Sequence, residues 1–177
     1  MRVRMSRWAP VLAVALWSFA GVTHGQERSR DAAVAGALKG SASPEYVDVS
    51  AYLTADADIE AWHTLVLNLK RNFDDICGDT FCEGEYSNIQ SLRYRCSVDR
   101  QTGAMGSCVW TFAASNEEIS PLTGKIVVDA QVWRCRSPLA RGTPIRDVLA
   151  ALAGPSPLYA PLPGTGRSIY DGLSACL

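Results

Sequence analysis

The side chains with the most evident chemistry are carboxylates, five of which lie within twelve residues: Asp74, Asp75, Asp79, Glu83 and Glu85. Carboxylates at such spacing can bind calcium, or can act in pairs as the acid and base of a glycoside hydrolase. The spacing does not follow the EF-hand pattern, and salt bridges from Lys70 or nearby arginines would neutralise the charges equally well. We expect a solvated or salt-bridged loop, and we assign Asp79, Glu83 and Glu85 to a candidate binding surface.

Arg93, Arg95 and Trp133 form the second candidate binding surface. Arginine and tryptophan are among the residues that most often anchor protein interfaces. The strand registers given below place these three residues on one polar face of a predicted sheet. The alternative is that the C-terminal segment folds over this face, held there by Cys135.

The chain offers few residues for catalysis. Beyond residue 25, His63 is the single histidine, which excludes mechanisms that need two, and no Gly-x-Ser-x-Gly motif accompanies it. The run Gly164-Thr165-Gly166 lacks the lysine of a phosphate-binding loop. We therefore assign no catalytic residue, no metal ligand and no cofactor.

Residues 1–25 have the composition of a secretory signal peptide. Three arginines precede an apolar stretch from Trp8 to Val22, and small residues before Gln26 suit a cleavage site. The stretch is shorter than the roughly 20 residues that span a bilayer, so cleavage is favoured over a retained anchor. Residues 26–44 are rich in alanine, glycine, serine and charge, and we expect them to be flexible.

The charge balance bears on the partners that the chain can bind. The net charge of the 177 residues is −1, and 14 basic residues face 18 acidic ones once the first 25 residues are set aside. A mildly acidic exported chain has no electrostatic reason to bind nucleic acid or an anionic membrane surface.

All six cysteines lie downstream of the predicted signal: Cys77, Cys82, Cys96, Cys108, Cys135 and Cys176. An even number after an export signal predicts three disulfides. Cys96 and Cys108 would lie opposite each other in a hairpin centred on Thr102. Cys77 and Cys82 are near enough to close a small loop, so Cys135 pairs with Cys176 by elimination. A thiolate metal site is disfavoured because the spacing within CGDTFC does not suit zinc.

A long amphipathic helix is predicted from Asp58 to Ile76. Its apolar side chains repeat at intervals of three and four: Ile59, Trp62, Val66, Leu69, Phe73 and Ile76. A short edge strand is expected between residues 45 and 53. Thr143 and Pro144 predict the start of a second, short helix, with Thr143 as its cap. Residues 168–177 are expected to form a last helical turn.

Three strands are predicted between these helices, over residues 90–99, 106–114 and 125–136. The hairpin that pairs Cys96 with Cys108 also places Tyr94 opposite Trp110 and Leu92 opposite Phe112. This register puts large apolar side chains next to one another on one face of the sheet.

A second hairpin centred near Ser120 would carry the same apolar face onto the third strand. It would pair Phe112 with Val128 and Trp110 with Ala130. The other face then carries polar and aromatic side chains: Arg93, Arg95, Val109, Thr111, Asp129, Gln131 and Trp133.

These elements predict an α+β fold stabilised by disulfides. The long amphipathic helix packs on a three- or four-stranded antiparallel sheet, and short C-terminal helices follow. We expect one domain over residues 45–177.

The predicted function is binding rather than catalysis. We expect an exported domain, periplasmic or secreted, that binds another macromolecule in the cell envelope, as an inhibitor or immunity-type protein does. The partner would be a protein. The alternative is a small carboxylate-dependent envelope hydrolase, with or without calcium. A structural component of the envelope, which would form stable oligomers, is a third hypothesis.

Overall fold

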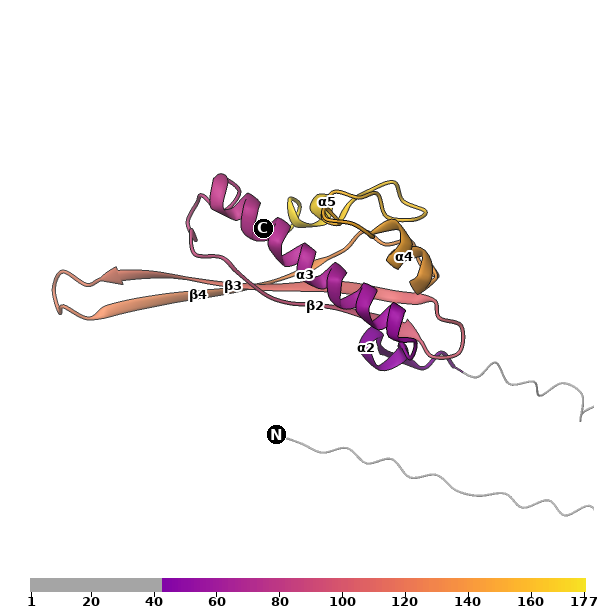
Figure 1. Ribbon diagram of the computed structural model, residues 1–177. Coiled ribbons are helices and arrows are strands. Elements are labelled where there is room, and N and C mark those ends of the chain that lie inside the picture. The colour runs from indigo at the N-terminus through magenta and orange to yellow at the C-terminus, as the bar shows by residue number, and fades with distance from the viewer. Residues whose placement is uncertain (1–42) are drawn as a thin grey trace, which may run out of the picture. The chain divides into compact units, whose positions relative to one another are not determined.

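The helices and strands of the chain follow one another in the order expected for an α+β protein. The computed structural model describes residues 43–177, which contain β1 (Tyr46–Asp48), α2 (Val49–Tyr52), α3 (Asp56–Asp79), β2 (Gln90–Asp99), β3 (Met105–Ile119), β4 (Ile126–Arg136), α4 (Ile145–Ala151) and α5 (Ile169–Leu173) (Figure 1). The predicted signal peptide and the segment from 26 to 42 lie outside these residues and stay predictions.

The four strands form one antiparallel sheet in the order β1-β2-β3-β4. The helices α3, α4 and α5 pack on one side of this sheet (Figure 1). The α+β fold, with a long helix on a four-stranded sheet and short helices after it, is therefore confirmed.

The helix α3 forms where the apolar spacing predicts it and extends two to three residues further at each end. Asp56 and Asp58 in its first turn stabilise the helix, because their negative charges lie at the positive end of the helix dipole. Its buried side chains meet an aromatic cluster on the sheet. The ring of Phe73 lies 4.7 Å from that of Phe112 and 5.8 Å from that of Trp110, measured between ring centroids. This cluster is the centre of the core.

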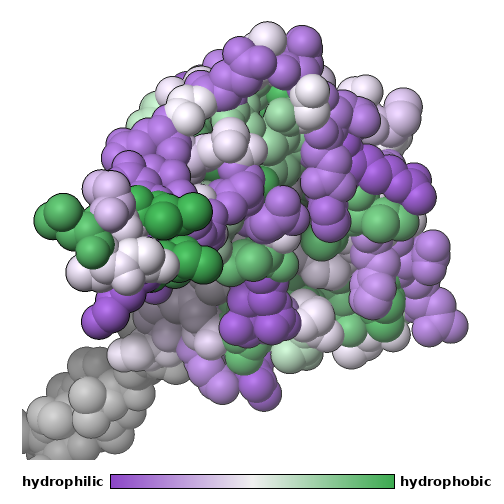
Figure 2. All heavy atoms as spheres, turned by 90° about the vertical axis from the view of Figure 1, so that its left-hand side faces the viewer, coloured by the Kyte–Doolittle hydropathy of each residue, from purple (hydrophilic) through white to green (hydrophobic). Residues whose placement is uncertain are grey.

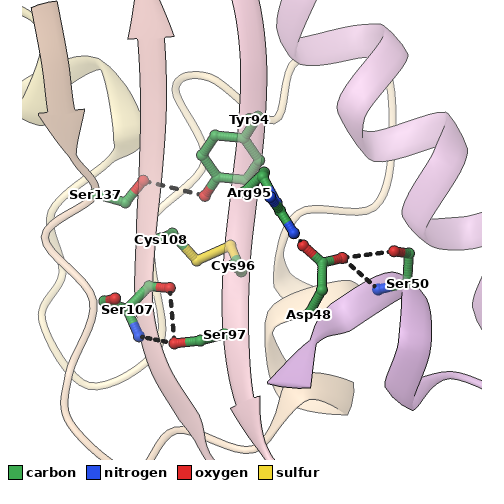
Figure 3. The surroundings of a disulfide bond; sticks show 9 residues. All are labelled: Asp48, Ser50, Tyr94, Arg95, Cys96, Ser97, Ser107, Cys108 and Ser137. Carbon is green, nitrogen blue, oxygen red and sulfur yellow. Dashed lines mark hydrogen bonds and ion pairs between the residues drawn. A yellow bond between two sulfur atoms is a disulfide. The ribbon is translucent and has the colours of Figure 1, made fainter. Parts of the chain in front are cut away.

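All three predicted disulfides are present: Cys77–Cys82, Cys96–Cys108 and Cys135–Cys176. The first closes the loop at the end of α3, the second joins β2 to β3 (Figure 3), and the third joins β4 to the C-terminal segment. Three disulfides and no free cysteine in residues 43–177 indicate an oxidising compartment.

The hairpin of β2 and β3 has the predicted register over most of its length. Cys96 pairs with Cys108 and Tyr94 with Trp110, but Leu92 does not pair with Phe112. A bulge places Ser91 opposite Phe112 instead, and Leu92 is 58% exposed. The Nε1–H of the buried Trp110 donates a hydrogen bond to the hydroxyl of Ser91 at 2.9 Å, so the bulge supplies the partner that a buried indole needs.

The predicted register of the second hairpin is wrong. Phe112 pairs with Trp133 and Trp110 pairs with Cys135. The strands are joined by residues 120–125, with Gly124 in the left-handed region at φ +68°. The midpoint of the hairpin therefore falls after Leu122 rather than at Ser120. Because side chains alternate along a strand, this shift moves every side chain of β4 to the face opposite the predicted one.

The corrected register changes what each face of the sheet carries. Cys135, Trp133 and Gln131 face the side of α3, and Cys135 is buried there. The C-terminal segment consequently packs on the same side as α3 and does not cover the other face (Figure 1). On that other face β4 carries Arg134, Val132 and Ala130, whereas Trp133, Gln131 and Asp129 are expected there from the sequence.

The C-terminal helices begin within one residue of the predicted positions, but Thr143 does not cap the first of them. Pro144 is the N-cap of α4, and the hydroxyl of Thr143 donates instead to the carbonyl oxygen of Ala140 at 2.7 Å. The helix α5 starts with a capping box in which Ser168 and Asp171 each accept a backbone N–H of the other.

The buried Tyr94 predicts a loss of stability at high pH. Its hydroxyl shares a hydrogen bond of 3.0 Å with Ser137 (Figure 3), and burial raises the pKa of Tyr94 to about 12. The ordinary value of about 10 applies to the unfolded chain. The contribution of the neutral phenol is thus complete below pH 10 and is lost as the pH rises through about 12.

The variant Tyr94→Phe isolates this effect. We expect the difference in the free energy of unfolding between wild type and variant to be constant up to pH 9 and to fall by about 1 kcal/mol by pH 11. Urea unfolding at a series of pH values measures it. A difference that stays constant up to pH 11 would contradict the burial of this phenol.

Candidate functional site

An open hollow at the base of the β3–β4 hairpin brings together residues of both candidate binding surfaces. It has a volume of about 430 Å³, and the side chains that matter for binding are Phe81, Glu83, Glu85, Tyr86, Gln131 and Trp133. We call it the acidic hollow. Glu83 and Glu85 come from the loop after α3, whereas Gln131 and Trp133 come from β4.

The loop that carries the two glutamates is held in place by its disulfide. The backbone N–H of Phe81 donates to the carbonyl oxygen of Ile76 as α3 ends, and the Cys77–Cys82 bond closes the turn that follows. Cys82 is buried, while Glu83 and Glu85 are exposed. The turn closed by the disulfide ends directly before Glu83, and both carboxylates are exposed at the rim of the hollow.

Tyr86 fastens the same loop to the hairpin. Its hydroxyl donates a hydrogen bond of 2.6 Å to the carboxylate of Asp129, and its ring lies edge-on to that of Trp133, with 5.5 Å between centroids. The hydrogen bond to Asp129 raises the pKa of Tyr86 to about 12. A short distance away Asn88 bonds both the backbone N–H and the hydroxyl of Ser115.

The hollow is acidic and aromatic, and no lysine or arginine of residues 43–177 lines it. Lys70 forms a salt bridge of 2.7 Å with Asp74, one of the pairings considered from the sequence. The ammonium group of Lys70 therefore neutralises Asp74 and not the glutamates of the hollow. Asp79 ends α3 as an exposed side chain and is not among the lining residues. Within the described part of the chain, no group of three acidic, histidine or cysteine side chains is placed to hold a metal ion.

Arg93 and Arg95 lie apart from the acidic hollow. They alternate along β2 with the buried Tyr94 and Cys96, which places them on the face of the sheet away from α3. Both also border the groove between α3 and this edge of the sheet. Arg95 bonds the carboxylate of Asp48 at 2.7 Å (Figure 3). Burial raises the pKa of Asp48, but hydrogen bonds from Ser50 and Arg95 outweigh burial and hold the pKa below its usual range.

The structure also shows a surface element that sequence reasoning missed. Residues 116–128, which we call the arm, are the part of the β3–β4 hairpin that extends beyond the rest of the domain (Figure 1). The arm exposes large apolar side chains: Ile119, Leu122, Ile126, Val127 and Val128. Figure 2, which views the molecule from the end of the arm, shows apolar side chains gathered on this surface. The wrong register hid the arm, because it assigned Val128 to the core.

His63 is exposed on α3, beside a groove of about 450 Å³ between α3 and β2. The groove is lined by apolar and basic side chains that include Trp62, Leu92 and Arg93.

Comparison with family models, with characterised proteins and with solved structures found no match to this chain. None of the helices in residues 43–177 has the length and apolar character needed to cross a bilayer.

Proposed function

We propose that this chain is an exported protein-binding domain of the cell envelope, periplasmic or secreted, that acts as an inhibitor or immunity-type protein. In this proposal the acidic hollow receives a lysine or arginine side chain of the partner. The observation that carries the proposal is the combination of Glu83, Glu85, Tyr86 and Trp133 around one open hollow that no lysine or arginine of residues 43–177 lines.

The chemistry of the hollow suits a cationic side chain. A guanidinium or ammonium group would meet carboxylates at the rim, where charge-assisted hydrogen bonds are strong. It would also meet the aromatic rings of Trp133 and Tyr86, which attract cations through their π faces. Both interactions favour a partner with a basic surface.

The scaffold favours binding because it is already ordered. The Cys77–Cys82 bond, the Tyr86–Asp129 hydrogen bond and the Asn88–Ser115 contacts fix the loop before any partner arrives. Little conformational entropy is then lost on association. Export is supported by the predicted signal peptide together with the three disulfides.

Partner capture from an envelope extract, followed by titration calorimetry with the captured protein, tests the proposal. We expect Trp133→Ala to weaken binding about 30-fold, the effect of losing a central aromatic anchor. The pair Glu83→Gln, Glu85→Gln should also weaken binding and reduce its dependence on salt. The matched control is Glu60→Gln, Glu118→Gln, which removes the same charge elsewhere and should bind as the wild type does.

Two outcomes would overturn the proposal. One is equal affinity of the wild type and both hollow variants for the captured partner. The other is turnover of a glycan substrate that is lost in the Glu83→Gln, Glu85→Gln variant, which would favour the carboxylate-dependent hydrolase instead.

A further inference from the structure

The face of the sheet away from α3, which we call the open face, carries an ordered pattern of charge. Next to the domain's core Thr111 lies between Arg93 on β2 and Arg134 on β4, and Val109 lies between Arg95 and Arg136. All four arginines are exposed. Arg95 is paired with Asp48, whereas no carboxylate of residues 43–177 lies within salt-bridge distance of the other three.

Toward the arm the side chains of the open face are first small or apolar, and then acidic. Ala113 pairs with Val132 and Ser115 with Ala130, which are the middle rows of the face. The next two rows pair Glu117 with Val128 and Ile119 with Ile126. The face therefore reads basic, small, acidic and apolar from the domain's core to the end of the arm.

We infer that a second copy of this chain packs on the open face, so that the arm of each copy lies across the sheet of the other. When one copy is reversed, the acidic row of each copy meets a basic row of the other. Glu117 and Thr111 lie three residues on either side of Ala114. A twofold axis across the strands at that level places Glu117 of one copy over Thr111 of the second copy, between Arg93 and Arg134 of that copy.

The same axis places Ile119 opposite an apolar side chain, whereas Val128 and Ile126 of β4 fall over Arg134 and Arg136 of the second copy. Ile119 of one copy falls over Val109 of the second, and Leu122, which is 94% exposed, falls near Gly106, next to Ser107. A shallow hollow of about 320 Å³ lies at this place on the open face, lined by Tyr46, Val109 and neighbouring side chains. The apolar end of the arm of one copy can therefore occupy this hollow on the second copy.

The middle of the face permits the close approach that such packing needs. Two sheets pack face to face at about 10 Å, with strands within about 30° of one another. Ala113, Ser115 and Ala130 are small enough for this distance. The interface would be isologous and closed, as in most homodimers, and it leaves the acidic hollow free, because Trp133 and Gln131 point to the other side of the sheet.

Charge-reversal variants of the chain without residues 1–25 test the inference. Their oligomeric state is measured by sedimentation or light scattering. We expect a dimer for the wild type and a dissociation constant raised tenfold or more by Glu117→Arg, which sets three positive charges together. The pair Arg93→Glu, Arg134→Glu should do the same. All three changes in one chain should restore the dimer, because the attraction is then reversed in sign.

Glu118→Arg is the matched control, since Glu118 is the next residue along the same strand but points to the opposite face. It should leave the dimer intact. Circular dichroism checks that every variant is folded. Any one of four results would overturn the inference. The wild type could be a monomer at millimolar concentration, or it could form open-ended oligomers. Glu118→Arg could have the same effect as Glu117→Arg, or the triple variant could fail to dimerise.

Discussion

Replacing Phe73 by alanine lowers the free energy of unfolding by about 3–5 kcal/mol, the range for truncating a fully buried phenylalanine. Phe73 is 1% exposed, and its ring fills the space between α3 and the rings of Trp110 and Phe112. Truncation would leave a cavity at the contact that joins helix and sheet. Denaturant unfolding with the disulfides intact measures this loss.

Leu67→Ala is the matched control on the same helix. Leu67 is 49% exposed, so its truncation removes little buried surface and should cost under about 1 kcal/mol. Equal losses for Phe73→Ala and Leu67→Ala would mean that α3 does not present the Phe73 side to the sheet.

Removal of the Cys135–Cys176 disulfide has the second large effect. The bond closes a loop across a sequence separation of 41 residues, and the chain-entropy relation gives about 4 kcal/mol for a loop of that size. The loop holds both C-terminal helices against the side of α3. We expect Cys135→Ala, Cys176→Ala to lower the free energy of unfolding by about that amount.

The bond Cys77–Cys82 provides the comparison, because its separation is only 5 residues. The same relation gives about 2 kcal/mol for so small a loop. Denaturant unfolding of the two double variants should therefore rank them in this order. A larger loss for Cys77→Ala, Cys82→Ala would show that the C-terminal segment is held by its packing and not by its crosslink.

The sequence was sufficient for the features that depend on local spacing. The stripe containing Trp62, Leu69 and Phe73 has a helical period, and α3 buries that stripe. Cys96 and Cys108 are separated by a short turn with one suitable centre, so their pairing followed from hairpin geometry. Each of these predictions used one segment and its immediate neighbour.

The register of β4 could not be obtained in the same way. Val128, Ala130 and Val132 are apolar, but so are Trp133 and Cys135 on the alternate positions. Alternation therefore did not identify which side faces the core. The choice depended on the length of the turn, and the turn around Leu122 and Gly124 is longer than the one assumed.

Three residues that line the acidic hollow were named from the sequence, but their grouping was not predicted. Glu83, Glu85 and Trp133 were all named from the sequence, on two separate surfaces, and the acidic hollow unites them. What joins them is the hydrogen bond from Tyr86 to Asp129, a contact between residues 43 positions apart. Residue type and spacing along the chain carry no signal for such a contact.

The pairing of β3 with β4 is the claim on which both proposed surfaces depend. It sets Trp133 beside the two glutamates and Arg134 beside Thr111. Cross-strand nuclear Overhauser effects in solution measure this pairing directly. The structure predicts contacts from Phe112 to Trp133 across the strands. Contacts from Phe112 to Val128 would contradict this pairing. They would place Trp133 on the open face, and Trp133 would then not line the acidic hollow.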